Sequence, residues 1–349
     1  MPVSGFQLPA TDPQPIFDAY RGIYETALLT SAVHDFGLFT ELAKQPSSDA
    51  RLQAALQMQP RPFQVLIVAM RAMRLVYRDV NGINHLTAVS REHLIGGEFD
   101  ISDYVSQAAE NPAVREITTR LRSNKPAGAE LDEQGVGWIY REGVHSAMDQ
   151  EAAARKLTLA LAGRAKNVAP VFAEKAPLAQ SKKLLDVGGG TGIYSIVCVK
   201  RHPHLRAVVW DRPEVLKVAR EFADAAGVAD RIELIAGDMF VDEPPADCDA
   251  VLLSNILHDW DVPECKKIID NLATSLPVGG RLMIHDALLN DAMDGPRGTA
   301  MYSANLFCLT EGRCYSGAEY RAWLKGSGLL VEDAPIPTLA ACSVVIGTR

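Results

Sequence analysis

The sequence lacks any long hydrophobic run. No stretch of its 349 residues approaches the ~18 consecutive apolar residues that a membrane-spanning helix needs. Residues 1–15 are polar and rich in proline, without the basic and then apolar pattern of a secretion signal. Positive charge is not in excess either, because 35 Lys and Arg stand against 43 Asp and Glu, a net charge of −8. We therefore expect a cytoplasmic protein with neither nucleic acid nor a membrane as a partner.

The sequence also lacks paired cysteines, internal repeats and low-complexity tracts. Its six cysteines are scattered and no two have the CxxC spacing, which excludes a zinc ribbon or zinc finger. We expect reduced thiols that mostly fill the core. Hydrophobic residues make up 48% and charged residues 22%, the composition of a folded globular protein. At ~150 residues per domain, the length predicts two domains.

The first third of the chain has the pattern of a helical domain with a small hairpin. Apolar residues recur at helical spacing through residues 16–43, and another helix is predicted over residues 61–75. Short runs on both sides of Asn81-Gly82 predict a β-hairpin, so helices and hairpin together indicate a winged helix. The apolar run 65–70 stands where a helix that reads the major groove needs polar and basic side chains. We therefore expect packing rather than DNA binding, and the apolar face of residues 16–43 favours an intertwined homodimer.

The second half alternates short apolar runs with helical patterns, which predicts a parallel sheet with crossover helices. Residues 183–192 run from an apolar strand into a glycine-rich turn, and a helix begins near Ile193. Glycines let the backbone approach a ligand, and the helix amino terminus offers unpaired N–H groups. The turn is not an NAD fingerprint, because Ile193 stands where that pattern needs Gly or Ala. It is not a P-loop either, because no Lys-Ser or Lys-Thr pair follows.

Acidic residues follow the next two predicted strands. Asp211 ends the run 207–211, where a carboxylate can accept hydrogen bonds from both hydroxyls of a ribose. Asp238 follows the third strand and can accept from the exocyclic amine of an adenine, while Met239 and Phe240 cover the flat face of the base. Each acid taken alone could instead be a helix N-cap. Their order along the chain favours a nucleoside-binding edge.

A histidine follows the fourth predicted strand, residues 250–254. His258 therefore lies at the mouth of the sheet, where ligands bind. Imidazole titrates near neutrality and can take a proton from a phenol or an enol. A structural histidine bonded to its own loop is the alternative. The fifth predicted strand ends in Asp286.

These segments resemble the class I S-adenosylmethionine-dependent O-methyltransferases, in particular the caffeate and acetylserotonin type and its bacterial natural-product relatives. The resemblance rests on Asp186–Gly192, Asp211, Gly237–Phe240 and Leu257–Trp260. It implies an α/β fold, a doubly wound, Rossmann-like sheet of seven strands behind an N-terminal, mainly helical winged-helix domain. The implied division is a dimerisation domain at 1–110, connecting helices that contribute to the substrate pocket at 111–180, and a catalytic domain at 181–349.

The resemblance also implies S-adenosylmethionine as the cofactor and a small molecule as the methyl acceptor. The residues implied to bind the cofactor are Asp186, Gly188, Gly190, Asp211, Gly237, Asp238, Met239, Phe240 and Ser254. Ser254 stands where plant relatives carry a lysine near the cofactor carboxylate, and its hydroxyl can still donate a hydrogen bond. The residues expected on the acceptor side are Trp138, Tyr302, Asn305 and Cys314. A buried Asn305 bonded only to backbone is left open.

For catalysis, the resemblance implies His258 as general base, oriented by Asp286, which is one methylene shorter than the usual Glu. A second Glu of the family aligns with Cys314, and a thiol cannot orient an imidazolium by charge. Either Asp286 suffices, or the reaction is not the standard deprotonation of a hydroxyl.

The implied reaction is methyl transfer to a hydroxyl of a small, aromatic secondary metabolite. One alternative is metal-assisted C-methylation of a 2-oxo acid or similar enolisable acceptor, with His258 and Asp259 as metal ligands. His285 is a candidate third ligand, although side chains alternate along a strand and Asp286 is expected to point into the site. The other alternative is a sensor or scaffold that binds S-adenosylmethionine without transferring its methyl group.

Overall fold

The computed structural model describes residues 7–125 and 151–349, which form two compact units. Residues 7–14, 151–288 and 315–349 make the first, here called the sheet unit, and residues 15–125 and 289–314 make the second, the helical unit. Residues 289–314 thus group with the helical unit, whereas the predicted boundary at residue 181 assigns them to the catalytic domain. The three-part division remains a prediction.

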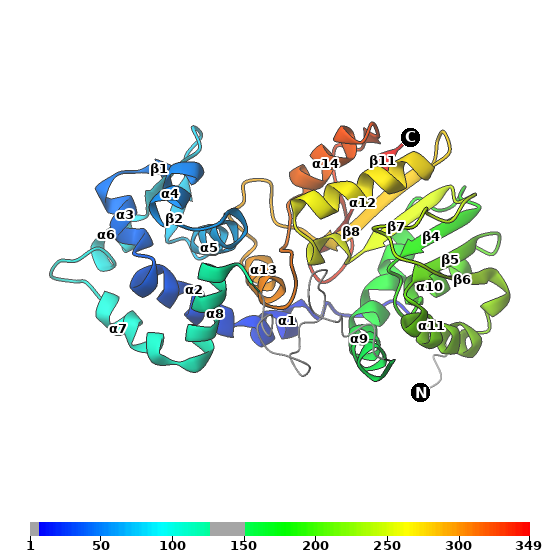
Figure 1. Cartoon of the computed structure of the whole chain (residues 1–349), viewed down its shortest axis with the longest axis horizontal. Coiled ribbons are helices and arrows are strands. Elements are labelled where there is room, and N and C mark those ends of the chain that lie inside the picture. Colours follow the sequence, from blue (N-terminus) through cyan, green and yellow to red (C-terminus); the bar gives the residue numbers. More distant parts are fainter. Residues whose placement is uncertain (1–6, 126–150) are drawn as a thin grey trace. The chain divides into compact units, whose positions relative to one another are not determined.

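The helical unit consists mainly of short helices around a small antiparallel sheet (Figure 1). Its elements are α1 (Gln14–Arg21), α2 (Ile23–Thr30), η1 (Ser31–Asp35), α3 (Leu38–Lys44), β1 (Ser47–Ser48), α4 (Asp49–Ala55), α5 (Pro60–Ala72), β2 (Val76–Arg78), β3 (Ile83–Leu86), α6 (Ala88–His93), α7 (Ser102–Ser106), η2 (Gln107–Glu110), α8 (Pro112–Ser123) and α13 (Arg297–Leu309). The helical stretch predicted at 16–43 is therefore divided, and Gly37 at φ +58° starts its last helix.

Local signals in the sequence explain several of these boundaries. The Ser48 side chain accepts a hydrogen bond from the first turn of α4, and Asn111 does the same for α8. Pro60 stands in the first turn of α5, where its missing N–H costs nothing. The predicted hairpin is confirmed, because β2 and β3 pair antiparallel with Tyr77 opposite His85.

Helix α5 lies in the core of the helical unit. Phe63, Leu66, Ile67 and Met70 are all buried, and the helix packs against α13 and β2. The apolar run at 65–70 therefore faces protein on both sides of the helix. This burial explains why the helix lacks the polar surface that reading a DNA groove needs.

The sheet unit contains an eight-stranded sheet in the order β10-β11-β8-β7-β4-β5-β6, and β9 pairs with β11. Its strands are β4 (Lys183–Val187), β5 (Arg206–Asp211), β6 (Ile232–Ala236), β7 (Ala250–Ser254), β8 (Arg281–Ala287), β9 (Leu330–Val331), β10 (Ile336–Pro337) and β11 (Cys342–Thr348). The strands from β6 to β8 are parallel, and β11 is antiparallel to β8. The expected strand number of seven is wrong by one. Two short strands, β9 and β10, lie beside β11, and Pro335 stands in the gap between them.

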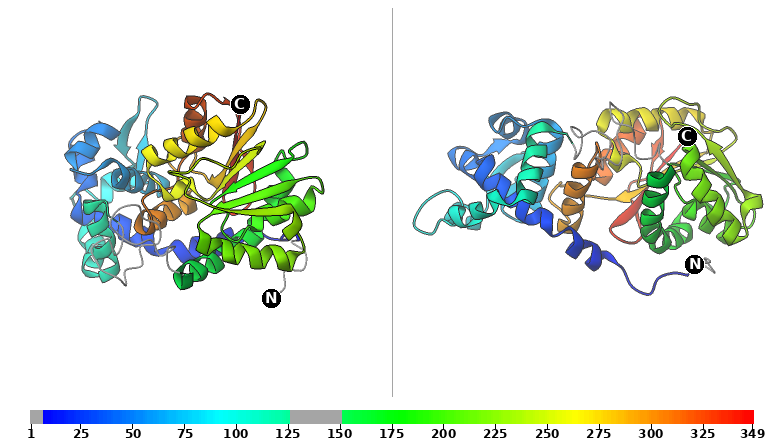
Figure 2. Two further views of the ribbon diagram at one scale, coloured as in Figure 1. Left: turned by 45° about the vertical axis from the view of Figure 1, so that its right-hand side comes forward. Right: turned by 60° about the horizontal axis from the view of Figure 1, so that its bottom comes forward.

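Helices cover both faces of this sheet, as Figures 1 and 2 show. They are α9 (Glu151–Lys175), α10 (Ile193–Arg201), η4 (Ala229–Arg231), α11 (Pro213–Ala226), η5 (Leu257–Asp259), α12 (Val262–Ser275) and α14 (Gly317–Gly326). One hydrophobic core joins α9, α10 and α11 to the sheet, and a second core joins α12 and α14 to the opposite face. This arrangement confirms the doubly wound α/β class.

The parallel register brings the carboxyl ends of the central strands to one edge. Val187 pairs with Trp210 across β4 and β5, and Ser254 pairs with His285 across β7 and β8. Ligands of doubly wound sheets bind at this edge. In the part of the chain that the structure describes, no helix is long and apolar enough to cross a membrane.

Candidate active site

A glycine turn follows β4 and leads into α10. Gly188, Gly190 and Gly192 have φ angles of +62°, +59° and +68°, which L side chains rarely adopt. A Cβ on Gly188 would lie 2.5 Å from the side chain of Ile256, whereas a Cβ on Gly190 would meet open space. The N-cap residue Gly192 has no side chain to cap α10, and within the first turn the backbone N–H of Ser195 bonds the carboxylate of Asp186. These features fit a cradle for the polar end of a cofactor.

Asp186 lies beneath this turn. Its Oδ2 accepts a hydrogen bond of 2.8 Å from the Ser195 hydroxyl, and a Cβ on Gly189 would press against its carboxylate. Burial raises the pKa of Asp186 to about 7. The observed contacts support the turn from within the protein, and direct binding of a ligand by Asp186 stays a prediction.

Asp211, at the end of β5, lies beside the same turn. The backbone N–H of Gly190 donates to Oδ2 at 2.9 Å, and the N–H of Arg212 donates to Oδ1 at 2.7 Å. Burial raises the pKa of Asp211 despite these bonds. Because each carboxylate oxygen can accept two hydrogen bonds, both keep capacity for the hydroxyls of a ribose.

The loop after β6 carries the predicted adenine-binding residues. Asp238 Oδ1 accepts from the backbone N–H of Phe240 at 2.9 Å, which fixes the loop in a tight turn. Gly237 packs against the indole of Trp210 so closely that any side chain there would overlap the ring. Phe240 is buried and Met239 is half-buried. The loop is therefore held rigidly at the strand end where the sequence analysis expects adenine.

His258, on η5, and Asp286, on β8, form a buried pair. Nδ1 of His258 and Oδ1 of Asp286 are 2.5 Å apart, and the two residues are 3% and 0% exposed. Burial alone would lower the pKa of His258, but the charges of Asp286 and Asp259 outweigh it and raise the pKa. Burial alone would raise the pKa of Asp286, but the charge and hydrogen bond of His258 lower it. The carboxylate therefore holds a proton on Nδ1, and Nε2 carries the lone pair in the neutral ring.

Asp259 adds a second carboxyl group next to this pair. Its Oδ1 lies 3.6 Å from Nε2 of His258. Burial raises the pKa of Asp259 to about 7, although the charge of His258 opposes this. Two carboxyl groups thus flank the imidazole inside the sheet unit, the buried Asp286 beside Nδ1 and the partly buried Asp259 beside Nε2.

Tyr320 is a site residue that the sequence analysis missed. Its hydroxyl donates a hydrogen bond of 2.9 Å to Oδ2 of Asp286, and the N–H of Ala287 donates to Oδ1 at 2.8 Å. Tyr320 belongs to α14, far along the chain from the strand-end motifs. Its position in an ordinary amphipathic helix gave no signal of this contact.

His285 closes a hydrogen-bonded chain on the other face of β8. Thr338 donates through its hydroxyl to the carbonyl of Cys342 at 3.0 Å, so its oxygen accepts from Nε2–H of His285 at 2.8 Å. Nδ1 of His285 then accepts the proton of the Ser254 hydroxyl, 3.0 Å away. Burial lowers the pKa of His285 to about 3, which keeps the ring neutral. The proton of Ser254 is therefore directed at His285, and a role of Ser254 toward a cofactor carboxylate stays a prediction.

Asn255, next to Ser254, is a second residue that the sequence analysis missed. Its backbone is left-handed, with φ +58°, and its Nδ2 donates to the Ser254 hydroxyl at 3.1 Å. Its Oδ1 is buried and makes no hydrogen bond to any described residue. A buried acceptor of this kind normally has a partner, so Oδ1 fits a donor group of a bound ligand. A left-handed backbone is not visible in a sequence.

The metal-assisted alternative needs a third ligand beside His258 and Asp259. His285 does not supply it, because both of its ring nitrogens are bonded to protein hydroxyls and Asp286 points to the opposite face of β8. Within residues 7–125 and 151–349, no group of three or more His, Cys, Asp or Glu side chains could hold a metal ion.

Two residues expected on the acceptor side make contacts inside the helical unit. The guanidinium of Arg21 lies 3.8 Å from the ring centroid of Tyr302, a cation–π contact. Asn305 Oδ1 accepts a hydrogen bond of 3.0 Å from the Tyr24 hydroxyl. The alternative of an Asn305 bonded only to backbone is therefore wrong, because its partner is a side chain.

The remaining two expected acceptor residues are Cys314 and Trp138. Cys314 is buried in the helical unit, and its backbone N–H donates to the Ser303 hydroxyl at 3.1 Å. Trp138 lies outside the described residues. The roles of both toward an acceptor stay predictions.

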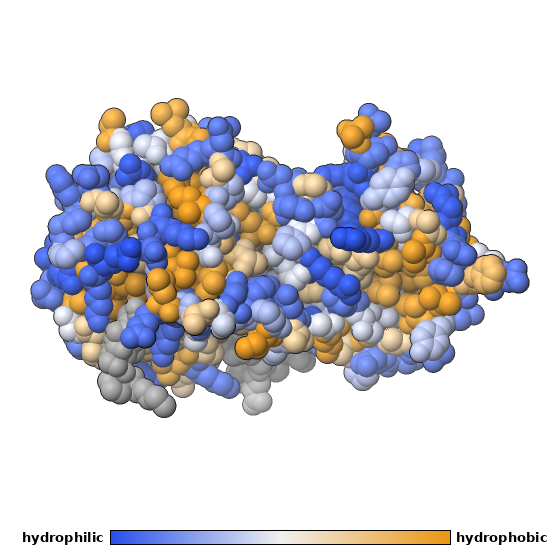
Figure 3. Space-filling model, turned by 180° about the vertical axis from the view of Figure 1, so that it is seen from behind, coloured by the Kyte–Doolittle hydropathy of each residue, from blue (hydrophilic) through white to orange (hydrophobic). Residues whose placement is uncertain are grey.

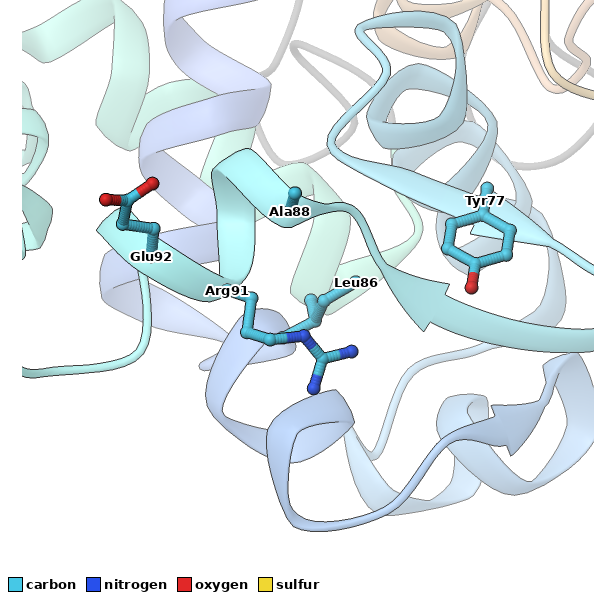
Figure 4. A pocket seen from close by; sticks show the side chains of 5 residues that line it. All are labelled: Tyr77, Leu86, Ala88, Arg91 and Glu92. Atoms are coloured by element: carbon cyan, nitrogen blue, oxygen red, sulfur yellow. The ribbon is translucent and has the colours of Figure 1, made fainter.

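Two surface hollows occur within the helical unit. One, of about 460 Å³, is shown in Figure 4 and is lined by Tyr77, Leu86, Ala88, Arg91 and Glu92. The other, of about 570 Å³, includes Arg71, Tyr77 and Arg297 among its lining residues. No residue of the expected site lines either hollow, so neither is the candidate active site.

A family model describes most of this region. Residues 136–330, more than half of the chain, match the O-methyltransferase domain. The chain belongs to the S-adenosylmethionine-dependent O-methyltransferases. The glycine turn, Asp211 and the His258–Asp286 pair of this O-methyltransferase all lie inside the matched range.

Relatives over the whole length agree with this family. The 3-hydroxy-5-methyl-1-naphthoate 3-O-methyltransferase of Streptomyces sahachiroi is 33% identical over 341 residues, which cover 97% of this chain and 95% of that protein. An O-methyltransferase family 2 protein from Planctomyces limnophilus, solved in complex with apigenin, is 40% identical, with a TM-score of 0.89 and 100% coverage of both chains. Human N-acetylserotonin methyltransferase, solved in complex with SAM, shares the fold at 20% identity, with a TM-score of 0.60 and coverage of 98% and 99%.

Proposed function

We propose that this O-methyltransferase transfers a methyl group to a hydroxyl of a small aromatic acceptor, a secondary metabolite, with His258 as the general base. The observation that carries the proposal is the buried His258–Asp286 pair, with 2.5 Å between Nδ1 and Oδ1. With its proton held on Nδ1, the neutral ring presents Nε2 to a phenolic hydroxyl. Asp286 stabilises the positive charge that His258 gains when it takes that proton.

The residues of the sheet unit fit the donor. S-adenosylmethionine, when bound, supplies an electrophilic methyl group on a sulfonium. Asp211 would accept hydrogen bonds from the ribose hydroxyls, and the open space beside Gly190 would take the methionine part. Asp238 and Met239 would hold the adenine. In-line displacement depends mainly on alignment, so a rigid cradle of this kind contributes directly to the rate.

Similar proteins support an aromatic acceptor. The relative from Streptomyces sahachiroi is named for a hydroxynaphthoate, and the protein from Planctomyces limnophilus was crystallised with apigenin, a flavonoid. Both compounds carry phenolic hydroxyls. Transfer to carbon is the second candidate, since the L-tyrosine C(3)-methyltransferase of Streptomyces lavendulae is 32% identical over 177 residues, 49% of this chain and 48% of that protein.

The helical unit supplies the proposed contact between two copies of the chain. Helices α1 and α2 expose Ile16, Tyr20 and Ile23 to 73%, 78% and 57%. Figure 3 shows several patches of hydrophobic side chains on the face it draws. Apolar side chains on adjacent helices of this kind favour a homodimer through this unit. The location in the cytoplasm stays a prediction.

Transfer of a labelled methyl group from S-adenosylmethionine to apigenin and to a hydroxynaphthoate tests the reaction. We expect phenol ethers with the wild type, and a fall in kcat of ~10²–10⁴-fold with His258→Ala, because the general base is removed. His204→Ala, which removes an exposed histidine, is the matched control and should keep full activity.

A chelator separates the oxygen reaction from the metal-assisted one. The ether products should form at the same rate in its presence. Methylated carbon products that disappear with the chelator would contradict the proposal, as would a His258→Ala variant of undiminished activity.

A further inference from the structure

Asp286 is held on the side away from His258 by Tyr320. The Tyr320 hydroxyl donates to Oδ2 at 2.9 Å, while Oδ1 contacts Nδ1 of His258 and accepts from the N–H of Ala287. Tyr320 and Asp286 are both fully buried. Each carboxylate oxygen thus has a partner, which fixes the plane of the carboxylate.

Helix α14 positions the Tyr320 ring next to Asp286. The helix begins with a capping box, in which Ser316 and Glu319 bond each other's backbone N–H. The Tyr320 ring packs against Trp323 at a centroid distance of 5.4 Å and an angle of 76°. The Tyr315 ring also lies next to the Tyr320 ring, with 5.7 Å between the two ring centroids. This packing directs the hydroxyl at Asp286.

Tyr320 acts as a donor only. Burial, reinforced by the negative charge of Asp286, raises the pKa of Tyr320 well above its ordinary value. The phenol therefore keeps its proton through the neutral pH range. A hydroxyl that always donates to a carboxylate stabilises the ionised form of that carboxylate.

We propose that Tyr320 is a positioning residue for methyl transfer, which holds Asp286 so that the carboxylate fixes the tautomer and orientation of the His258 base. This inference rests on the proposed role of His258. The buried phenol gives Asp286 a restraint on Oδ2, in addition to the contacts of Oδ1 with His258 and Ala287.

Several other charged or titratable groups face this cluster. Asp259 on η5 raises the pKa of His258, whereas Arg164 on α9 lowers the pKa values of both His258 and Asp286. Cys265 on α12 and Tyr315, just before α14, face the Tyr320 ring. Removing one hydroxyl from Tyr320 leaves all of these groups in place, so a change in titration reports the hydrogen bond itself.

The variant Tyr320→Phe removes only the hydroxyl. Oδ2 of Asp286 then lacks its hydrogen-bond donor. The negative charge of the carboxylate therefore attracts a proton on His258 more strongly, which raises the pKa of His258. The neutral base becomes scarcer at a given pH. We expect the acid limb of kcat to move up by ~0.5–1 pH unit. We also expect kcat at its plateau to fall about tenfold because the base is less well oriented. The KM for S-adenosylmethionine should stay unchanged.

Tyr315→Phe is the matched control. Tyr315 is equally buried in the same aromatic cluster, but its hydroxyl donates to the backbone carbonyl of Trp260 at 2.6 Å. Its loss should lower the thermal stability and leave the acid limb where it is. A general disturbance of the cluster would move the limb in both variants and would overturn the proposal.

A second substitution tests the same bond without removing it. Site-specific replacement of Tyr320 by 3-fluorotyrosine keeps the shape and makes the phenol a stronger donor. The acid limb should then move down, opposite to its shift in Tyr320→Phe. This variant also decides the question if Tyr320→Phe does not fold.

The pKa of His258, measured from ring ¹⁵N shifts and assigned with His258→Ala, gives a readout that needs no turnover. We expect it to rise in Tyr320→Phe and to fall with fluorotyrosine. If the wild type is active and both Tyr320 variants keep the acid limb and the His258 pKa of the wild type, the role of Tyr320 is overturned and the proposed function is not. A wild type that transfers no methyl group would instead overturn the proposed function, and the inference with it.

Discussion

At the scale of single residues, burial and charge act on His258 in opposite directions. Burial lowers its pKa, the carboxylates of Asp286 and Asp259 raise it, and the carboxylates prevail. The protonated ring cannot accept a proton from a hydroxyl. The same charges that hold the base in place therefore also set the pH below which it stops working.

The pH dependence of the reaction follows from this balance. Because the pKa of His258 is raised, we expect kcat to decline as the pH falls through a value above ~6.5. His285 adds no second limb near neutrality, since its pKa is lowered to about 3, whereas Asp259, with a pKa raised to about 7, titrates in the same range as His258. A kcat profile from pH 5 to 9 with a phenolic acceptor checks this. A profile that stays flat to pH 5 would mean that His258 is not the titrating base.

Gly237 gives a second prediction at this scale. A Cβ there would overlap the indole of Trp210, so Gly237→Ala must displace the loop that carries Asp238. We expect about 1–3 kcal/mol less free energy of unfolding, as for other overpacked sites, and about tenfold weaker binding of S-adenosylmethionine. Thermal unfolding and calorimetric titration measure both quantities. Gly326→Ala is the control, because a Cβ there meets nothing within 4 Å and should be tolerated.

Which residues can be found from sequence depends on where they lie. His258 and Asp286 each follow an apolar strand, and the parallel register then requires them to meet at one edge. Tyr320 meets the same carboxylate from a helix, and helical spacing does not say which atoms a buried hydroxyl reaches. The left-handed backbone of Asn255 sets the direction of its side chain. The tautomer of His285 sets the direction of the Ser254 proton. Neither the backbone conformation nor the tautomer can be predicted from residue types alone.

At the scale of elements, the central strands were predictable, and the short strands β9 and β10 were not. The strands β5, β7 and β8 each contain an unbroken run of at least three apolar residues, because a parallel strand is covered on both faces. The strands β9 and β10 have two residues each, too few for any periodicity. Their place at the edge of the sheet also allows Pro337, which a central strand would exclude.

The start of α14 carries a prediction of its own. Ser316→Ala removes the side chain that accepts from Glu319 N, and the loss of an N-cap costs about 1 kcal/mol of the free energy of unfolding. Because α14 also carries Tyr320, the plateau kcat should fall slightly with the stability. Ser316→Thr keeps the acceptor and should restore both. Chemical denaturation compares the three proteins, and equal loss in Ser316→Thr would argue against the cap.

At the scale of the whole molecule, residues distant in the chain build each unit. Residues 289–314 return to the helical unit after the sheet has begun, because α13 packs against α5. Both helices are apolar, but nothing in their spacing identifies them as partners. A division of the chain from sequence therefore follows composition along the chain, whereas the structure groups residues by packing.

The proposed homodimer is tested by a charge at its expected contact. Tyr20 is 78% exposed on α1, and Tyr20→Glu should shift the enzyme to monomers in sedimentation velocity because burying a carboxylate in an apolar contact costs free energy. Val278→Glu is the control, since Val278 is 94% exposed in the sheet unit. The homodimer through α1 would be refuted by a Tyr20→Glu protein that sediments like the wild type.

The hydrogen-bonded chain from Ser254 through His285 to Thr338 has an evolutionary consequence. Each member fixes the proton of the next, so a residue at position 254 that cannot donate a hydrogen bond would leave Nδ1 of a neutral His285 without its donor. Substitutions at these three positions should therefore have non-additive effects on stability. In descendants of this sequence, we expect the three positions to change together or not at all.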